Sequence, residues 1–254
     1  MLRFCKNQSI LNQKNIYSGQ TPKSKKIKVL KSCNSKINCN RKFDNKATAM
    51  HFEPNQIYHV YNRGNNKQPL FFSDANYLYF LQKIKTDWKK YADVLCYCLM
   101  PNHFHCMLAP NEDGCKNIVL ANKETHLQNL SKTIGKTLSS YTKATHIQNK
   151  TTGNLFQKKT KAKLLTGANR LIETFSYHDY MSTCFHYIHQ NPLKSKLVTN
   201  LTDWLYSSYP DYYNNRNGTI CNKDLALQLL DLTGIDFKKD PVKELNNDII
   251  ERIF

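Results

Sequence analysis

Two histidines that are two residues apart are the first feature of this sequence that could carry chemistry. His103 and His105 stand in the apolar stretch LMPNHFHCML, residues 99–108. In a β-strand alternate side chains point to the same face, so both imidazoles would lie on one face and Phe104 on the other. Two imidazoles on one face could share a metal ion. The alternative is that both are structural and are satisfied by hydrogen bonds within the sheet.

A tyrosine and an asparagine one helical turn apart form the second candidate. Tyr187 and Asn191 lie in FHYIHQNPLKSKLV, residues 185–198, and a spacing of four places them on one face of a helix. The apolar stripe of that helix leaves Tyr187 out, because it consists of Met181, Cys184, Phe185 and Ile188. A phenol beside an amide oxygen could act as a nucleophile next to a metal ligand. Alternatively, the tyrosine is an amphipathic surface residue and the asparagine closes the helix before a proline.

Basic residues in extended segments supply the third candidate. The run FQKKTKAK contributes Lys158, Lys159, Lys161 and Lys163. Lysines in such a segment could contact phosphates, although a solvated edge strand is an equally simple explanation. The segment QIYHVYNR, residues 56–63, adds Arg63 for phosphate contact and aromatic rings that could stack on bases.

The elements that must position these side chains follow from periodicity. Residues 56–63 mix β-branched and aromatic residues as strands do. Two further strands are expected at 93–100 and 103–109, joined at Pro101-Asn102 as a hairpin in the sheet centre. Helices are expected where apolar residues recur every three or four positions, at 75–92 (Leu78, Leu81, Ile84, Trp88), at 122–146 (Leu127, Leu130, Ile134, Leu138) and at 170–190. The pattern predicts an α+β fold, with helices packed against a mainly antiparallel sheet.

Charge divides the chain into two parts. The formal net charge is +18, and residues 1–49 carry 12 of the 37 Lys and Arg residues against Asp44 alone. This sign favours a polyanionic partner, either nucleic acid or an anionic membrane surface. We expect residues 1–49 to form a largely disordered basic arm, with a domain at 50–212 and a helical extension at 213–254. The alternative for the first segment is that Met50 is the true initiator.

Cysteine usage and hydropathy indicate the compartment. The nine cysteines show no paired C-x-x-C spacing, which favours reduced thiols over a disulfide framework. The C-x-C of Cys96 and Cys98 is explained most simply by small apolar residues in a strand. The sequence has neither an apolar run long enough to span a bilayer nor the apolar region of a secretory signal, so we expect a cytoplasmic protein with no membrane partner.

The order of the motifs resembles a known family. IYHVYNRGNNKQPLFF is followed by MPNHFHCML, then by GNLFQKKTKAKLL, and then by YIHQNPLKSKLV with DWLYSSY after it. This order is similar to that of the IS200-like Y1 transposases, in particular the branch of REP-associated tyrosine transposases. The resemblance covers roughly residues 52 to 212, and the joint order is more specific than any single motif.

The resemblance implies an HUH nuclease with a ferredoxin-like or RRM-like core. His103 and His105 would then bind a divalent ion, Mg²⁺ or Mn²⁺, and Asn191 matches the polar ligand of the family, four residues after the nucleophile. Tyr187 matches that nucleophile, which forms a 5′-phosphotyrosine. Tyr180 and Tyr141 are weaker candidates because neither has a ligand-type residue four positions later.

The resemblance also implies a partner, namely single-stranded DNA or a DNA hairpin in a repeat element, and therefore a nucleoid-associated location. Within the family both dimers and single subunits occur, so a homodimer stays open. The competing hypothesis is a catalytically silent regulator that binds DNA or RNA hairpins on the same scaffold. The presence of His103, His105, Tyr187 and Asn191 together favours the enzyme, because a pure binding protein has no need of the set.

Overall fold

The computed structural model describes residues 50–121, 123–166, 177–213 and 216–230, with isolated positions 245, 247, 250 and 251. These residues all belong to one compact unit, Asn45–Phe254. The basic arm predicted at 1–49, the first residues of the helix predicted at 170–190 and most of the predicted C-terminal extension lie outside the described residues. The domain boundaries therefore remain predictions.

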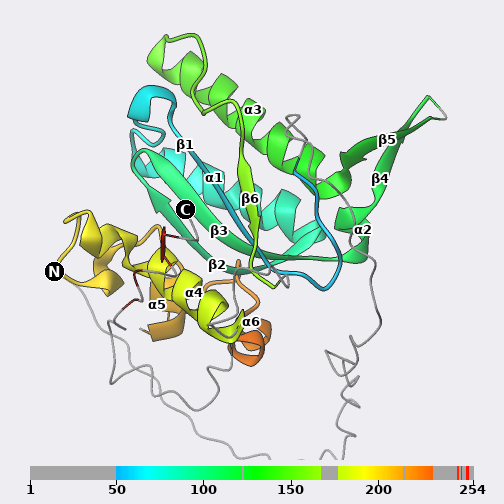
Figure 1. The fold of residues 1–254 in the computed structure, drawn as a ribbon. Coiled ribbons are helices and arrows are strands. Elements are labelled where there is room, and N and C mark those ends of the chain that lie inside the picture. Colours follow the sequence, from blue (N-terminus) through cyan, green and yellow to red (C-terminus); the bar gives the residue numbers. More distant parts are fainter. Residues whose placement is uncertain are drawn as a thin grey trace, which may run out of the picture. The chain divides into compact units, whose positions relative to one another are not determined.

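A four-stranded antiparallel sheet forms the centre of the described unit, and Figure 1 shows its strands side by side. Its spatial order is β2-β3-β1-β6. The strands are β1 (Tyr58–Arg63), β2 (Ala92–Met100), β3 (His103–Pro110) and β6 (Lys161–Leu164). The predicted α+β class and the predicted hairpin of β2 and β3 are confirmed. The hairpin is off-centre, however, because β1 and β3 are the inner strands and β2 is an outer strand of the described sheet.

Alternate residues of β3 belong to opposite faces of the sheet. Phe104 packs into an apolar core with Phe80 and Trp88, with ring centroids 5.2 and 6.1 Å away. Met107 belongs to a second core, which also contains Phe185. The sheet is thus buried on both faces, and the side of the histidines is the side opposite Phe104.

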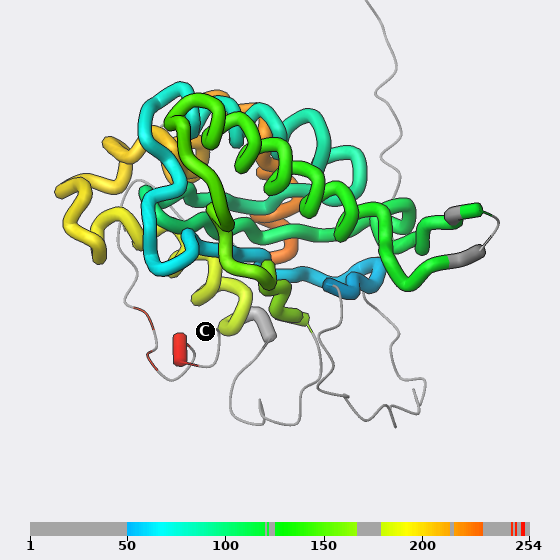
Figure 2. Tube along the Cα trace, turned by 90° about the horizontal axis from the view of Figure 1, so that it is seen from above, coloured from blue at the N-terminus to red at the C-terminus, as the bar shows by residue number. Residues whose placement is uncertain are grey.

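Helices α1 (Asp74–Asp87) and α3 (Asn129–Asn149) cover one face, and α4 (Tyr177–Lys194) lies against the other, as Figures 1 and 2 show together. The predicted stripe of α1 is partly wrong, since Leu78 is 61% exposed and Tyr77 and Phe80 are buried in its place. Leu81, Ile84 and Trp88 are buried as predicted, and with Tyr77 and Phe80 they still form a stripe of side chains three and four apart.

The predicted start of the second helix is also wrong. Residues predicted to be helical from 122 onward form strand β5 (Lys123–Gln128), which pairs with β4 (Asn117–Leu120) in a small separate sheet. The β-branched Thr125 is suited to a strand, and its hydroxyl donates to the carbonyl of Ile118 at 2.8 Å. Helix α3 therefore begins at Asn129 and extends three residues beyond its predicted end.

Helix α4 continues through Pro192 rather than ending before it. Proline removes the amide donor that the Ile188 carbonyl would normally receive. The Asn191 side chain lies over this gap, with its Nδ2 2.8 Å from the carbonyl oxygen of Tyr187 and 3.5 Å from that of Ile188. The amide group thereby supports the last turn of the helix.

Short elements complete the described unit: η1 (Asn65–Lys67), η2 (Trp88–Lys90), α2 (Glu112–Cys115), η3 (Leu201–Asp203), α5 (Tyr209–Tyr213) and α6 (Lys223–Leu229). Helix α6 packs on the α4 side of the sheet through Ala226. The described cysteines are free thiols, and Cys96 and Cys98 are buried in the apolar core, as expected. Among the described helices, none combines the length and apolar character that crossing a bilayer requires.

Replacing Phe104 tests whether alternate side chains of β3 point to opposite faces of the sheet. Phe104→Ala should lower the free energy of unfolding by about 3–5 kcal/mol, because the ring is fully buried and its removal leaves a cavity. The exposed Phe72 is the control, and Phe72→Ala should cost less than about 1 kcal/mol. Urea denaturation measures both. A small effect at Phe104 would contradict its placement in the core.

Candidate active site

Four predicted site residues converge where β3 begins and α4 ends. The ring centroids of His103 and His105 are 4.9 Å apart, and that of Tyr187 is 6.0 Å from that of His105. The Asn191 side chain hydrogen-bonds with both His103 and Tyr187. The structure therefore brings together residues that are more than 80 positions apart in the chain.

His103 is held through one ring nitrogen. Its Nδ1 lies 2.6 Å from Oδ1 of Asn102, an acceptor, so Nδ1 carries the proton of the neutral ring and Nε2 keeps its lone pair. Burial lowers the pKa of His103, and the hydrogen bond with Asn191 partly offsets this. The ring is therefore suited to donate a lone pair from Nε2.

His105 is held by a second, deeper histidine that the sequence analysis did not single out. Nδ1 of His105 lies 2.9 Å from Nε2 of His59, and the two rings stack with centroids 5.0 Å apart. Both side chains are buried. Because this contact occupies Nδ1 of His105, its Nε2 is the nitrogen left for the site. A histidine in β1 is visible in the sequence, but the register that pairs it with β3 is not.

Burial keeps this histidine pair neutral. It lowers the pKa of His59 to about 3, and the nearby Lys163 acts in the same direction. Burial also lowers the pKa of His105 well below its ordinary value, and His59 and His103 add to the effect. Two neutral imidazoles in hydrogen-bond contact share one proton between them, which fixes the orientation of the His105 ring.

Tyr187 is half-buried, and its phenol is protonated near neutral pH. Burial raises the pKa of Tyr187 to about 12, Cys184 and Tyr61 add to the rise, and the hydrogen bond with Asn191 opposes it. The ammonium of Lys194, two turns later on the same helix, lies 5.4 Å from the centre of the ring. Sequence reasoning missed Lys194, although its spacing of seven would place it on the face of Tyr187.

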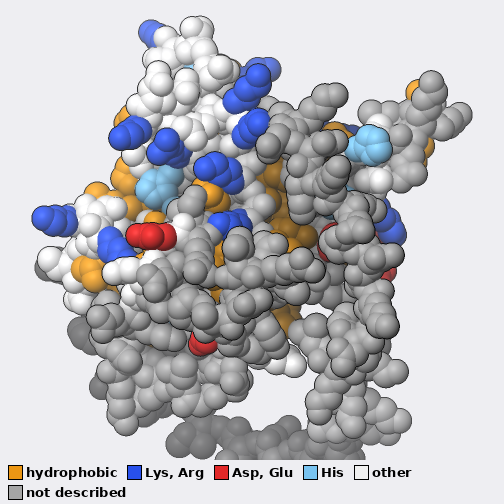
Figure 3. Space-filling model, in the orientation of Figure 1, with side chains coloured by type: hydrophobic (Ala, Val, Ile, Leu, Met, Phe, Trp, Pro, Cys, Tyr) orange, Lys and Arg blue, Asp and Glu red, His pale blue; other side chains and the backbone are white. Residues whose placement is uncertain are grey.

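A basic cavity of about 420 Å³ opens beside these residues. It is lined by Tyr61, Asn62, Arg63, Lys67, Asn102, His103, His105, Gln157, Lys159, Lys161 and Tyr187. Among these described lining residues there is no carboxylate, so the cavity is suited to an anion. Figure 3 shows Lys and Arg side chains gathered around a histidine over the region of β1 and β6.

The predicted lysines divide between two places. Lys159 and Lys161 line the basic cavity with Arg63, and the ammonium of Lys161 lies 5.5 Å from the centre of the Tyr61 ring. Lys158 lines a different groove. Lys163 pairs in register with His59 and lines neither.

The weaker tyrosine candidates lie elsewhere. Tyr141 is fully buried, and its hydroxyl donates to the carbonyl of Leu70 at 2.6 Å. Tyr180 is buried in the core on the α4 side of the sheet. Neither lines the basic cavity, so Tyr187 is the candidate that the geometry retains.

The donors at the site suit a divalent ion with open coordination positions. The described residues contain no group of three His, Cys, Asp or Glu side chains arranged to hold a metal. The donor set would instead be Nε2 of His103, Nε2 of His105 and Oδ1 of Asn191. The amide oxygen is available because Nδ2 faces the helix carbonyls. Two imidazoles and one amide fit a transition metal such as Mn²⁺ and leave positions for substrate.

The comparisons with known proteins cover protein families, curated proteins and solved structures. The chain matches no protein-family model and no curated protein. It is similar to a solved structure described as "Structure of the REP associates tyrosine transposase bound to a REP hairpin". The similarity covers 80% of this chain and 100% of that chain, with 14% sequence identity and a TM-score of 0.45.

The buried histidines should make stability depend on pH. Their pKa is near 6.5 in the unfolded chain, whereas burial lowers the pKa of His59 to about 3 and those of His105 and His189 well below the ordinary value. The unfolded state therefore binds more protons below about pH 6.5, and stability falls as the pH drops. Each such histidine contributes a slope of about 1.4 kcal/mol per pH unit.

The measurement is urea unfolding at several pH values above about pH 5, with a chelator present to exclude metal ions. His59→Phe should remove about 1.4 kcal/mol per pH unit from the slope, since one of the contributing groups is gone. An unchanged slope in this variant would show that His59 is already protonated in the folded protein at these pH values.

Proposed function

We propose that this protein is a metal-dependent endonuclease and strand transferase that acts on single-stranded DNA, with Tyr187 as its nucleophile. The observation that carries the proposal is the convergence of Tyr187, Asn191, His103 and His105 beside a cavity whose described lining is basic. A phenol, a ligand set and an anion-binding surface are the three parts that phosphodiester cleavage by a tyrosine requires.

The reaction is a transesterification. The Oη of Tyr187 forms a bond to phosphorus, the bond from phosphorus to the 3′ oxygen breaks, and the phenolic proton passes to solvent while the 3′ oxygen takes up a proton. The products are a 5′-phosphotyrosine and a free 3′ hydroxyl. A second 3′ hydroxyl can reverse the step and join a different strand, so the energy of the phosphodiester bond is conserved.

The residues around Tyr187 have separate roles in this proposal. Arg63, Lys159 and Lys161 bind backbone phosphates and bring the strand to the tyrosine. His103, His105 and Asn191 hold Mg²⁺ or Mn²⁺, which when bound neutralises charge on the nonbridging phosphate oxygens. His59 orients His105 through the contact at Nδ1.

Lys194 assists Tyr187 in this scheme. A cation 5.4 Å from the ring centre favours the phenolate that forms during attack, and so opposes the effect of burial on the pKa of Tyr187. The ammonium therefore supports the nucleophile without touching the ligand set.

The raised pKa of Tyr187 favours a second candidate function as well. A protein that binds hairpin DNA or RNA in the same basic cavity without cleaving it would regulate rather than mobilise a repeat. The two candidates share the binding surface and differ in the covalent step.

Replacement of the nucleophile separates these candidates. Tyr187→Phe should abolish the covalent protein–DNA adduct, because the ring remains but its Oη is lost, while hairpin affinity stays within about threefold of wild type. Denaturing gels with labelled hairpins that carry unpaired flanks detect the adduct, and Tyr180→Phe is the matched control. Binding without an adduct in the wild-type protein would instead support the regulator, and an adduct that persists in Tyr187→Phe would place the nucleophile elsewhere.

Loss of a ligand tests the metal assignment. His103→Ala and His105→Ala should each lower Mn²⁺ affinity by more than about tenfold and remove metal-dependent cleavage, since each takes away a first-sphere nitrogen. Electron paramagnetic resonance of free Mn²⁺ gives the affinity independently of activity. The control is His126→Ala, whose exposed position in β5 lies outside the cavity. Unchanged Mn²⁺ affinity in both site variants would refute the assignment.

A further inference from the structure

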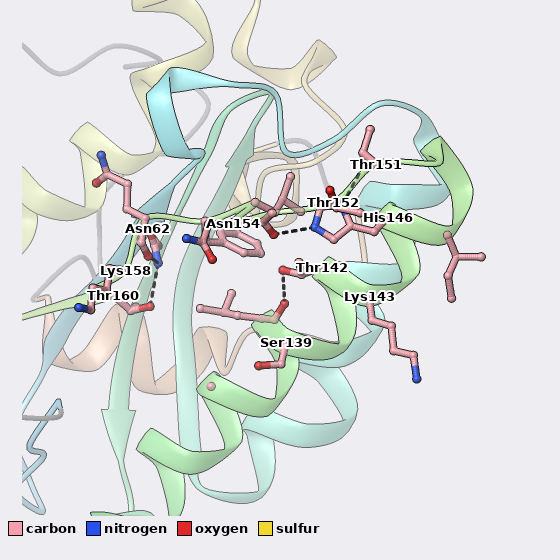
Figure 4. Close-up of a pocket in the computed structure, with 17 residues that line it drawn as sticks. Asn62, Ser139, Thr142, Lys143, His146, Thr151, Thr152, Asn154, Lys158 and Thr160 are labelled. Carbon is pink, nitrogen blue, oxygen red and sulfur yellow. Dashed lines mark hydrogen bonds between the residues drawn. The ribbon is translucent and has the colours of Figure 1, made fainter.

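A second, larger groove lies between α3 and the segment that leads into β6. Its volume is about 760 Å³, within the range of ligand pockets. One wall consists of residues of α3 and the other of residues 151–160. Figure 4 shows Asn62, Lys158 and Thr160 together at one end, and His146, Thr151 and Thr152 at the other.

The groove and the basic cavity meet at the edge of the sheet. Both are lined by Asn62 and Gln157. Lysines of the segment 157–161 alternate between them, since Lys158 lines the groove and Lys159 the cavity. An extended segment turns successive side chains to opposite sides, so this segment is a ridge with a binding surface on each side.

Hydrogen bonds hold this ridge and the far wall in place. Nδ2 of Asn62 donates to Oγ1 of Thr160 at 2.9 Å and to the carbonyl of Gln157 at 3.2 Å. At the other end, Nδ1 of His146 lies 2.9 Å from Oγ1 of Thr151, and Nε2 of His146 lies 2.9 Å from the carbonyl of Gly153. The groove is thus a formed surface rather than a space between loose loops.

The chemistry of the walls fits unpaired nucleotides. The described lining residues include Lys143 and Lys158 and no carboxylate. Hydroxyl and amide groups, among them those of Ser139 and Asn154, face the space with donors and acceptors that match exposed base edges. Ile147 is 71% exposed on the same surface and offers an apolar contact for a base.

A glycine lines the groove at a position where packing does not require one. Gly135 lies within α3, where glycine costs about 1 kcal/mol relative to alanine. A Cβ at this position would meet no atom within 4 Å, so packing does not require the glycine. A side chain here would instead enter the groove. The missing side chain leaves space that the protein itself does not use.

We infer that this groove binds unpaired nucleotides of the same DNA strand whose phosphate lies at Tyr187. The strand passes over the ridge at Asn62 and Gln157, with Lys159 on one side and Lys158 on the other. This inference rests on the proposed function for the identity of the strand. It adds a second contact region, which makes affinity depend on the length of the unpaired segment.

Filling the groove tests the inference. In full-length protein carrying Tyr187→Phe, so that no cleavage occurs, Gly135→Trp should weaken binding of a single strand of about 12 nucleotides about tenfold. It should leave binding of a strand of about 4 nucleotides unchanged, because that strand occupies only the basic cavity. Fluorescence anisotropy gives both affinities.

Matched variants on the same helix control for bulk and fold. Ala144→Trp adds the same side chain at an exposed position outside the groove, and should bind both strands like the parent protein. Gly135→Ala should raise the melting temperature by about 2–4 °C, since it adds only a Cβ in open space to a helix, and this would show that the helix accepts a side chain at this position.

A charge comparison gives a second readout. Lys143→Gln should reduce the salt dependence of binding of the longer strand by about one ion, whereas Lys136→Gln, also exposed on α3 but outside the groove, should not. Equal changes in these two variants would indicate a general effect of net charge and would overturn the inference.

The outcomes distinguish this inference from the proposed function. If wild-type protein forms the adduct but Gly135→Trp binds both strands normally, the function stands and the groove inference fails. If no adduct forms but Gly135→Trp selectively weakens the longer strand, the groove is a strand-binding surface on a protein that does not cleave. An equal loss for both strands, or for a fully paired hairpin without flanks, would assign the effect to another surface and overturn the inference.

Discussion

The register between β1 and β3 is the constraint on which the site depends. This antiparallel pairing sets Arg63 opposite His103 and Tyr61 opposite His105. Side chains alternate along each strand, so a slip of one residue would exchange the two faces. If β3 slipped in this way, the histidines would move toward α1 and α3 and Phe104 would move toward Tyr187. The register that buries the aromatic rings on one face of the sheet therefore also forms the polar site on the other face.

Helix α4 both packs on the sheet and positions Tyr187 and Asn191, the proposed nucleophile and the proposed metal ligand. Phe185 and Ile188 anchor it to the sheet, and this fixes the azimuth at which Tyr187 and Asn191 face the histidines. Pro192 removes a backbone donor, and the Asn191 amide lies over the gap that results. The same side chain thus completes the helix with its nitrogen and presents its oxygen to the site. The position of this proposed ligand is therefore set by an ordinary requirement of the helix, a partner for its last carbonyl groups.

Sequence patterns predicted the parts of this structure that depend on local rules. Alternation indicated that His103 and His105 share a face, and a spacing of four indicated the same for Tyr187 and Asn191; the structure shows both pairs so placed. His59 could not be found in this way, because its contact with His105 depends on a cross-strand register over 46 residues. The predicted start of α3 was wrong because residues 123–128 share the helical period of α3 but pair with β4 as a strand. Periodicity does not show where the edge of the sheet lies, so it could not predict that the lysines divide between two surfaces.

Strand β6 is the last strand in the order of the described sheet, and its outer backbone groups are those of an edge. Exposed edges pair readily with other chains, and lysines on an edge strand are a common safeguard against this. Lys161 and Lys163 stand on this edge, and Lys158 and Lys159 just before it. The same lysines therefore favour binding of a polyanion and protect the sheet edge from aggregation. Removing several of these charges would also expose the sheet edge to self-association, so solubility limits how far this surface can change.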